Sequence, residues 1–371
     1  MKTGYISACL LTMLVLCSSC IQDEPLNPES DILSFSIPSN IAFSEAMINQ
    51  SANTITVFVK ENADLSQVTA TVTTNETSVV SPQSNATVDF TKPVIYTVTA
   101  EDKVHTRDYT VTLIPMTKDV FTSLMLKFNF DTWTVSSQNY ATPHQVLDLV
   151  KFNIFSTSNE GVSLYQQLAT PALFPTHPIQ RNGGFAAEMV TQKGPGNILN
   201  IQYIPVIAGC VFTGTMNLLN ALKDPLTATQ MGQAFFQKPL RMKGLYNYKA
   251  GTGDYIGPDG KVKPGVKDSC AIYAVFYKTD DQVKILDGTN IRSHQNVVSL
   301  AMMPNRSSTP GNELVPFDIP FLPVNPIEID FHKYTYKLAL IFSSSFWGDR
   351  YEGVYGSKLI IDDVEIETED K

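Results

Sequence analysis

A short segment near the C-terminus gathers side chains that could bind a ligand. Between two strand-like runs it carries Trp347, Asp349, Arg350, Tyr351 and Tyr355. Aromatic rings offer flat stacking surfaces, whereas carboxylate and guanidinium groups form bidentate hydrogen bonds. The segment therefore suits a small molecule that presents both apolar faces and several hydroxyl groups.

Tyr246 and Tyr248, in a second segment close to predicted loops, could contribute to the same site. Both could instead pack against a sheet, which is a frequent use of tyrosine in a strand. Trp347 has Gly348 and charged residues beside it, which favours exposure to solvent. The sequence leaves both uses of these rings open.

Several familiar catalytic patterns do not occur. Ser343, Ser344 and Ser345 lack the flanking glycines of a strand-turn-helix nucleophile elbow, so we interpret them as polar residues at a strand end. The five histidines are scattered, without the close pairing of a zinc site. Residues 251–253, Gly-Thr-Gly, are typical of a turn and not of a phosphate-binding loop.

The elements that must position these residues are predicted to be strands. β-branched residues alternate with polar ones in runs separated by turns about every ten residues. The runs cover residues 32–37, 54–59, 68–72, 94–99 and 109–113. They predict a small β-sandwich over residues 31–115.

After a junction near residues 115–118 the chain becomes richer in Phe, Tyr, Gly and Pro. Strand-like runs recur at residues 124–130, 197–207, 210–216, 270–277, 336–342 and 358–366. Only residues 218–222 and 145–150 could form short helices. We expect an all-β chain whose second domain, residues 120–371, is a larger jelly-roll sandwich.

The first residues predict export. Lys2 precedes an apolar run of about a dozen residues, too short for a membrane-spanning helix, which needs about 20. Ser18 and Ser19 before Cys20 resemble the lipobox of bacterial lipoproteins, although Cys17 stands where Leu is usual. The acidic residues that follow resemble the surface-export signal of Bacteroidota lipoproteins. Residues 1–20 would then be a signal peptide, Cys20 the lipidated residue, and residues 21–30 a tether.

The net charge limits the classes of binding partner, and the cysteines limit the possible disulfides. The formal net charge of −9 argues against nucleic acid, whose binders concentrate Lys and Arg. Cys210 and Cys270 lie outside the leader and could form a disulfide in an oxidising compartment, or remain two free thiols.

Five blocks in sequence order resemble the putative carbohydrate metabolism domain family of Bacteroidota lipoproteins. They cover residues 128–133, 212–214, 238–248, 268–270 and a closing block of 343–349 with 356–366. The departures are Cys210, where a polar residue is more usual, and a long stretch between Trp133 and Gly183. Residues 31–115 resemble the immunoglobulin-like N-terminal domains of surface lipoproteins.

The resemblance implies a jelly roll related to carbohydrate-binding modules, a carbohydrate partner and an outer-membrane location through the lipid anchor. Binding of glycans is the leading hypothesis, with the first domain acting as a spacer. A glycoside hydrolase would need two carboxylates about 5 to 9.5 Å apart, for which Asp254, Asp268, Asp349 and Glu352 are candidates. The third hypothesis is a structural or adhesive surface protein.

A structural calcium is the one cofactor that the resemblance implies. Strict alternation places Ile360, Asp362, Val364 and Ile366 on one face of the last strand. A carboxylate among apolar residues needs a cation or several donors. Related jelly rolls hold calcium there with a second acid near the first strand, which corresponds to Asp131 here, beside Asp362 and Asp363. Donors from the protein alone could serve instead.

Overall fold

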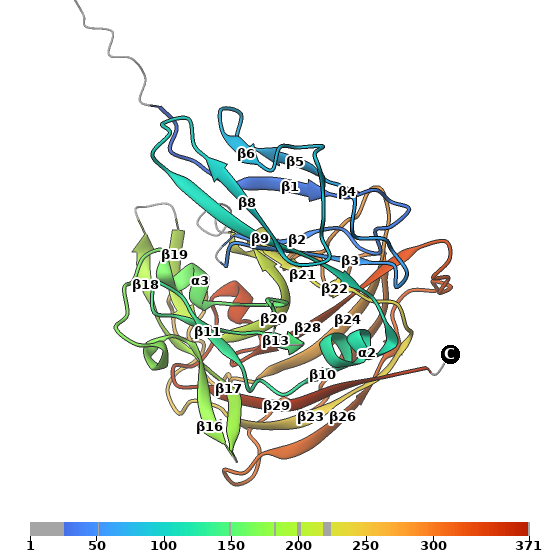
Figure 1. The fold of residues 1–371 in the computed structure, drawn as a ribbon. Coiled ribbons are helices and arrows are strands. Elements are labelled where there is room, and N and C mark those ends of the chain that lie inside the picture. The colour runs from blue at the N-terminus through green and yellow to red at the C-terminus, as the bar shows by residue number, and fades with distance from the viewer. Residues whose placement is uncertain are drawn as a thin grey trace, which may run out of the picture.

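The computed structural model describes residues 26–50, 52–147, 150–181, 183–198, 202–217 and 224–369. The predicted signal peptide and Cys20 lie outside these residues. The described chain is all-β, with an N-terminal unit (residues 26–116) packed against a larger C-terminal unit (residues 117–369), as Figure 1 shows.

The N-terminal unit is a β-sandwich. Its main sheet has the order β2-β3-β9-β8-β6, in which β3 and β9 run parallel and the other pairs antiparallel. Two shorter pairs, β1-β5 and β4-β7, complete it. The strands are β1 (Ile32–Ser36), β2 (Met47–Asn49), β3 (Thr54–Val59), β4 (Val68–Thr69), β5 (Thr71–Thr74), β6 (Val79–Ser81), β7 (Thr87–Val88), β8 (Val94–Thr99) and β9 (Thr106–Pro115).

The C-terminal unit is a two-sheet sandwich. Within the described residues, one sheet has six strands in the order β16-β17-β29-β23-β26, with β10 paired to β29. The other has eight, in the order β15-β20-β28-β24-β25-β27, with β21 and β22 at its margins. In Figure 1 the eight-stranded sheet lies between the N-terminal unit and the six-stranded sheet.

The six-stranded sheet contains β10 (Lys127–Phe128), β16 (Thr176–Arg181), β17 (Gly184–Val190), β23 (Pro239–Lys249), β26 (Val315–Pro320) and β29 (Lys358–Thr368). The eight-stranded sheet contains β15 (Phe155–Thr157), β20 (Cys210–Met216), β21 (Thr229–Met231), β22 (Gln233–Ala234), β24 (Ala271–Thr279), β25 (Val297–Met302), β27 (Leu322–Pro323) and β28 (Thr335–Ser343). In the described part of this unit, three strand pairs lie outside both sheets: β11 (Trp133–Val135) with β12 (Ala141–Pro143), β13 (Gln145–Leu147) with β14 (Val150–Phe152), and β18 (Gln192–Ile198) with β19 (Gln202–Ile207). The helices are short: α2 (Lys118–Phe121), η1 (Thr122–Leu126), α3 (Asn159–Ser163), η2 (Pro171–Leu173), α5 (Pro225–Ala228) and η3 (Gly348–Arg350).

Alternation explains where the core sits. Inward residues of the two facing sheets, such as Met242, Phe276, Leu340 and Ile361, form one apolar cluster between the sheets. The N-terminal unit has a second cluster of its own around Tyr96 and Tyr109. Both units therefore bury an apolar interior that strand periodicity predicts.

The two units share part of a core. Phe58 and Ile114 of the N-terminal unit belong to the same buried cluster as the sandwich interior. Phe43 packs edge-on against Phe236, with ring centroids 3.8 Å apart. Nζ of Lys284 in the C-terminal unit lies 3.7 Å from Oε1 of Glu45 in the N-terminal unit. An apolar junction of this kind favours one relative orientation of the two units.

Two local predictions are wrong. The strand predicted at residues 124–130 is confined to β10 (Lys127–Phe128), because residues 124–126 belong to the π-helix η1 and bury Leu124 and Met125 in the core. Residues 145–147 are the strand β13 and not a helix, since they pair with β14. The predicted helix at residues 218–222 lies outside the described residues. In the part of the chain that the structure describes, no helix has the length and apolar character needed to cross a membrane.

Candidate functional site

A cavity of about 170 Å³ lies against the outer face of the eight-stranded sheet. Its floor consists of alternate residues from the neighbouring strands β20, β24 and β28. These residues are Cys210, Phe212, Ala271, Tyr273, Ile341 and Ser343. Because alternate side chains of a strand share a face, this floor is the reverse side of the sandwich core.

Three other segments wall the cavity. The long stretch between Trp133 and Gly183 contributes Ser158, Val162 and Tyr165 from around α3. The β18-β19 hairpin and α5 contribute apolar side chains. The segment after β28 contributes Phe346, Asp349 and Tyr351.

Two of the cavity's aromatic residues, Tyr165 and Tyr273, were missed by sequence reasoning. Tyr165 belongs to the stretch that departs from the family pattern, and Tyr273 looks like any other core residue of a strand. No spacing rule in the sequence could mark either one, because they meet only through strand pairing and the path of the α3 segment.

Asp349 brings an unsatisfied acceptor to this cavity. Its Oδ1 is buried without a hydrogen-bond partner, and its Oδ2 lies 3.4 Å from Nη2 of Arg292. Burial raises the pKa of Asp349 despite the nearby arginines. The buried hydroxyl of Tyr165 also has no partner, and burial raises the Tyr165 pKa. Unpartnered buried polar atoms are rare in proteins, and two on one cavity indicate a place for a polar ligand.

The carboxylate of Asp268 holds the segment that carries these residues. Its Oδ2 accepts hydrogen bonds from the hydroxyls of Ser345 and Ser357, at 2.6 and 2.7 Å, and from the backbone N–H of Val354 at 2.8 Å. Its Oδ1 accepts from the Ser269 N–H at 2.8 Å. Burial raises the pKa of Asp268 against the effect of these donors. Three of the four donors come from the two ends of the site segment, so Asp268 closes it into a loop.

The serine run has a structural role. Thr191 Oγ1 lies 2.8 Å from Ser344 Oγ and 2.6 Å from Ser345 Oγ, all three being buried. These hydroxyls join the loop to the end of β17 and face no base.

Trp347, Arg350 and Tyr355 lie near the cavity but do not line it. Trp347 is 36% exposed, and the guanidinium groups of Arg350 and Arg292 lie 4.3 and 5.1 Å from its ring centroid. Tyr355 is 37% exposed and donates its hydroxyl to the carbonyl of Pro205 at 3.0 Å. Of the five residues predicted in this loop, Asp349 and Tyr351 line the cavity itself.

Tyr246 and Tyr248 were wrongly assigned to the ligand. They are 9% and 0% exposed and belong to the core between the sheets. Uninterrupted alternation along β23 places both on the inward face of Met242, and the bulge of β29 opposite Gly244 does not change the phase of β23.

The same bulge overturns the predicted calcium site. Asp363 has a φ of 47°, and beyond it the alternation changes phase, so Leu359, Ile361, Val364 and Ile366 are the core residues. Asp362 therefore lies on the opposite face, where it forms an ion pair with Arg181 at 2.5 Å. The arginine supplies the cation that the buried carboxylate requires.

Asp131 also has protein partners. Its carboxylate accepts hydrogen bonds from the Phe185 N–H at 2.9 Å and from Asn129 Nδ2 at 2.6 Å. No group of three or more His, Cys, Asp or Glu side chains suited to a metal occurs among the described residues. Cys210 and Cys270 are both free thiols.

The carboxylate candidates for hydrolysis are dispersed. Asp268 is held by its four donors, Glu352 pairs with Lys263 at 2.5 Å, and Asp254 is exposed away from the cavity wall.

A further carboxyl, Glu160 in α3, is almost fully buried, and its Oε1 has no hydrogen-bond partner. Burial raises the pKa of Glu160 to about 7. Its side chain does not line the cavity, although its neighbours Ser158 and Gly161 do.

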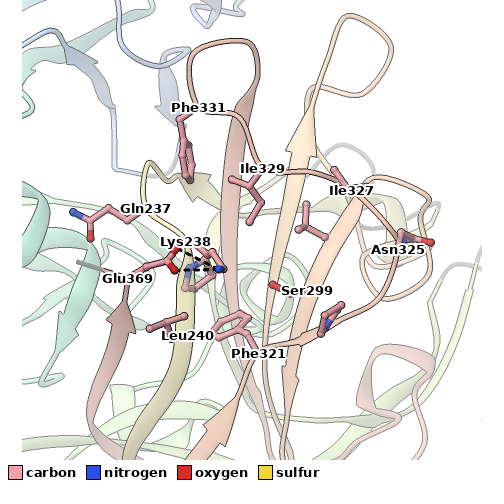
Figure 2. A pocket seen from close by; sticks show the side chains of 13 residues that line it. Gln237, Lys238, Leu240, Ser299, Phe321, Asn325, Ile327, Ile329, Phe331 and Glu369 are labelled. Carbon is pink, nitrogen blue, oxygen red and sulfur yellow. Dashed lines mark hydrogen bonds and ion pairs between the residues drawn. The ribbon is translucent and has the colours of Figure 1, made fainter. Parts of the chain in front are cut away.

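A second, larger cavity of about 640 Å³ lies where β23 of one sheet approaches β25 of the other, and Figure 2 shows it. Some of its polar groups have partners within the protein: Lys238 pairs with Glu369 at 3.2 Å, and Asn325 Nδ2 donates to two backbone carbonyls. The remaining walls are largely apolar side chains, namely Leu240, Phe321, Ile327, Ile329 and Phe331. Among the described residues, none that lines this cavity carries a buried polar atom without a partner, so it is the weaker candidate for a hydroxyl-rich ligand.

Comparison with known proteins places the chain in a family. Residues 129–367 match the model of the putative carbohydrate metabolism domain, and residues 32–113 match that of the N-terminal domain of surface glycan-binding proteins. The chain belongs to the putative carbohydrate metabolism domain family. No curated protein matches it.

Two solved structures resemble the chain over long stretches. One is described as a putative glycoside hydrolase from Bacteroides thetaiotaomicron VPI-5482; it is 31% identical, with a TM-score of 0.83 over 94% of this chain and 100% of that chain. The other is described as a putative glycoside hydrolase from Bacteroides vulgatus ATCC 8482; it is 28% identical, with a TM-score of 0.60 over 67% of this chain and 99% of that chain. A glycan-related role is common to these matches.

Replacing Asp268 by alanine tests the loop anchor. Asp268→Ala leaves three donors of the loop without their acceptor, and we expect it to lower the free energy of unfolding by about 3 kcal/mol. Urea denaturation measures this. Asp318→Asn, which breaks an exposed pair with Arg241, is the control and should cost less than about 1 kcal/mol. An equal loss in both variants would contradict the anchor role.

Replacing Glu160 by glutamine tests the buried carboxyl. The folded pKa of about 7 lies above the ordinary value of 4.5, so the folded state binds the proton more tightly and stability falls as the pH rises between these values. The difference corresponds to about 3 kcal/mol. Glu160→Gln should therefore stabilise the protein at about pH 8 and change it little at about pH 4.5.

The measurement for Glu160 is chemical denaturation across that pH range, with Glu365→Gln as an exposed control. A Glu160→Gln variant with the same pH dependence as the parent would show that the carboxyl is not buried as described.

Proposed function

We propose that the chain is a cell-surface protein that binds a glycan in the cavity on the outer face of the eight-stranded sheet. The observation that carries the proposal is the meeting of aromatic walls with two unpartnered polar atoms, Oδ1 of Asp349 and the hydroxyl of Tyr165. Sugars combine apolar ring faces with hydroxyl groups, and this lining offers partners for both.

The size of the cavity limits what enters it. At about 170 Å³ it is smaller than the roughly 300 to 1,000 Å³ typical of sites for drug-sized ligands. It accommodates the terminal unit of a glycan, with the rest of the chain running over the surface outside it. A cavity of this size would recognise the end of a glycan chain.

Binding is favoured over hydrolysis by the carboxylates. A glycosidase of the usual kind needs two carboxyl groups on opposite sides of the scissile bond. Of the four acids considered from the sequence, only Asp349 lines the cavity, and Glu160 does not reach its surface. The relatives described as glycoside hydrolases keep hydrolysis as the second candidate, which product analysis decides.

The location is part of the same proposal. The match of residues 32–113 to the N-terminal domain of surface glycan-binding proteins supports display at the cell surface. A lipid on Cys20, followed by the tether, would attach the N-terminal unit to the outer membrane. The packed junction between the units would then fix the direction in which the cavity faces.

A glycan array with the chain from residue 21, followed by calorimetry on each ligand found, tests the binding site. We expect Asp349→Asn to weaken binding by about tenfold or more, because it removes a charged acceptor. Tyr165→Phe should weaken binding by about fivefold without loss of stability, since its hydroxyl has no partner in the protein.

The control for these variants is Tyr355→Phe, whose hydroxyl bonds to the protein outside the cavity. Unchanged affinity in both Asp349→Asn and Tyr165→Phe would refute this location for the site. If the parent protein released new reducing ends from the bound glycan and Asp349→Asn abolished this release, hydrolysis would replace binding as the proposed function.

Metabolic labelling with a fatty acid tests the anchor. The parent protein should incorporate label and fractionate with the outer membrane, whereas Cys20→Ala should lose both because the acceptor thiol is gone. Cys17→Ala is the matched control and should keep the label. Retention of label by Cys20→Ala would argue against lipidation at this residue.

A further inference from the structure

Three arginines gather around two aromatic rings at the edge of the cavity. The guanidinium of Arg306 lies 3.8 Å from the ring centroid of Phe346, and that of Arg292 lies 5.2 Å from the same ring. The guanidinium of Arg350 lies 4.3 Å from the ring centroid of Trp347. We call this set, Arg292, Arg306, Arg350, Phe346 and Trp347, the arginine ladder.

The ladder carries an excess of positive charge. Asp349, at 3.4 Å from Arg292, is the carboxylate in contact with it, and among the described residues Arg306 and Arg350 form no ion pair. Three cations against one carboxylate leave two positive charges, in a chain whose formal net charge is −9. Arg181 and Arg241, on the six-stranded sheet, each have a carboxylate partner.

Arg306 is also incompletely hydrogen-bonded. Its Nη1 is buried without a partner in the described residues. A buried charged donor without an acceptor is unfavourable unless a ligand supplies one. A neutral hydroxyl would satisfy the hydrogen bond but would leave the charge uncompensated.

Stacking fixes how the guanidinium groups can act. A guanidinium over an aromatic face is held by cation–π attraction, and its N–H groups point outward in its own plane. That edge matches the paired oxygens of a carboxylate or a sulfate ester. The ladder borders the cavity through Phe346, which lines it, and through the contact of Arg292 with Asp349, which lines it too.

We propose that the arginine ladder recognises an anionic group on the glycan, so that the ligand is an acidic saccharide with a uronate or sulfate next to its terminal unit. The inference rests on the proposed function, because the cavity must hold the sugar ring that carries the charge. Asp349 would accept hydroxyl groups of the sugar, while Arg306 and Arg350 would take the anion. Trp347 would act by holding Arg350 and not as a sugar platform.

Matched ligands test the proposal with the chain from residue 21. One pair is an oligogalacturonate and the same oligomer with methyl-esterified carboxylates; the second is a sulfated disaccharide and its unsulfated form. We expect the charged member of at least one pair to bind about tenfold more tightly, and added salt to weaken only that member. The pair that responds distinguishes a uronate from a sulfate ester.

Arg350→Gln and Arg306→Gln should each reduce the preference for the charged member by at least about fivefold and leave affinity for the neutral member unchanged. Arg350 is exposed, so this variant should fold even if Arg306→Gln does not. Arg241→Gln, on the other sheet and paired with Asp318, removes the same charge and should have no effect.

The outcomes separate the two proposals. Equal affinity for both members of each pair, or a preference that survives both variants, overturns the arginine ladder and leaves glycan binding intact. Competition by inorganic sulfate alone as strong as by the acidic saccharide would also overturn it, because the ladder would then be a bare anion site. Failure of every saccharide to bind would overturn the proposed function together with this inference.

Discussion

The site depends on one buried carboxylate. Asp268 accepts hydrogen bonds from Ser345, Val354 and Ser357, and so ties both ends of the loop to the start of β24. Without that acceptor, the loop would have no fixed path from β28 to β29, and Asp349 would not be presented to the cavity. An acid that by sequence could have been catalytic is in fact the fixed point of the architecture.

The cavity lies on the face of the sheet that the sandwich core does not use. Each strand of β20, β24 and β28 has one face buried between the sheets, and its other face must be covered or exposed. The α3 segment, α5 and the loop after β28 cover it incompletely, which leaves room lined by rings and by polar atoms without partners. The unmatched polar groups and the arginine ladder make this space suited to a ligand, whereas no described residue of the larger cavity in Figure 2 carries a buried polar atom without a partner.

Much of the fold follows from local pattern. Alternating β-branched and apolar residues predict the strands β3, β8, β20, β24 and β28 closely, because a pleated strand places alternate side chains on opposite faces. The same rule failed at β29, where one extra residue at Asp363 reversed the phase. That bulge moved Asp362 away from the core and towards Arg181, and so removed the argument for calcium.

The sequence by itself determined the all-β class, the extended strands, the family and the loop that bears Asp349 and Tyr351, since each depends on residues close together in the chain. Only the tertiary structure decided that Tyr246 and Tyr248 are core, that Tyr165 and Tyr273 join the site, and that Asp268 is an anchor. The physical reason is that burial and hydrogen-bond satisfaction depend on neighbours that are distant along the chain, 77 positions apart for Ser345 and Asp268, and no local spacing records them.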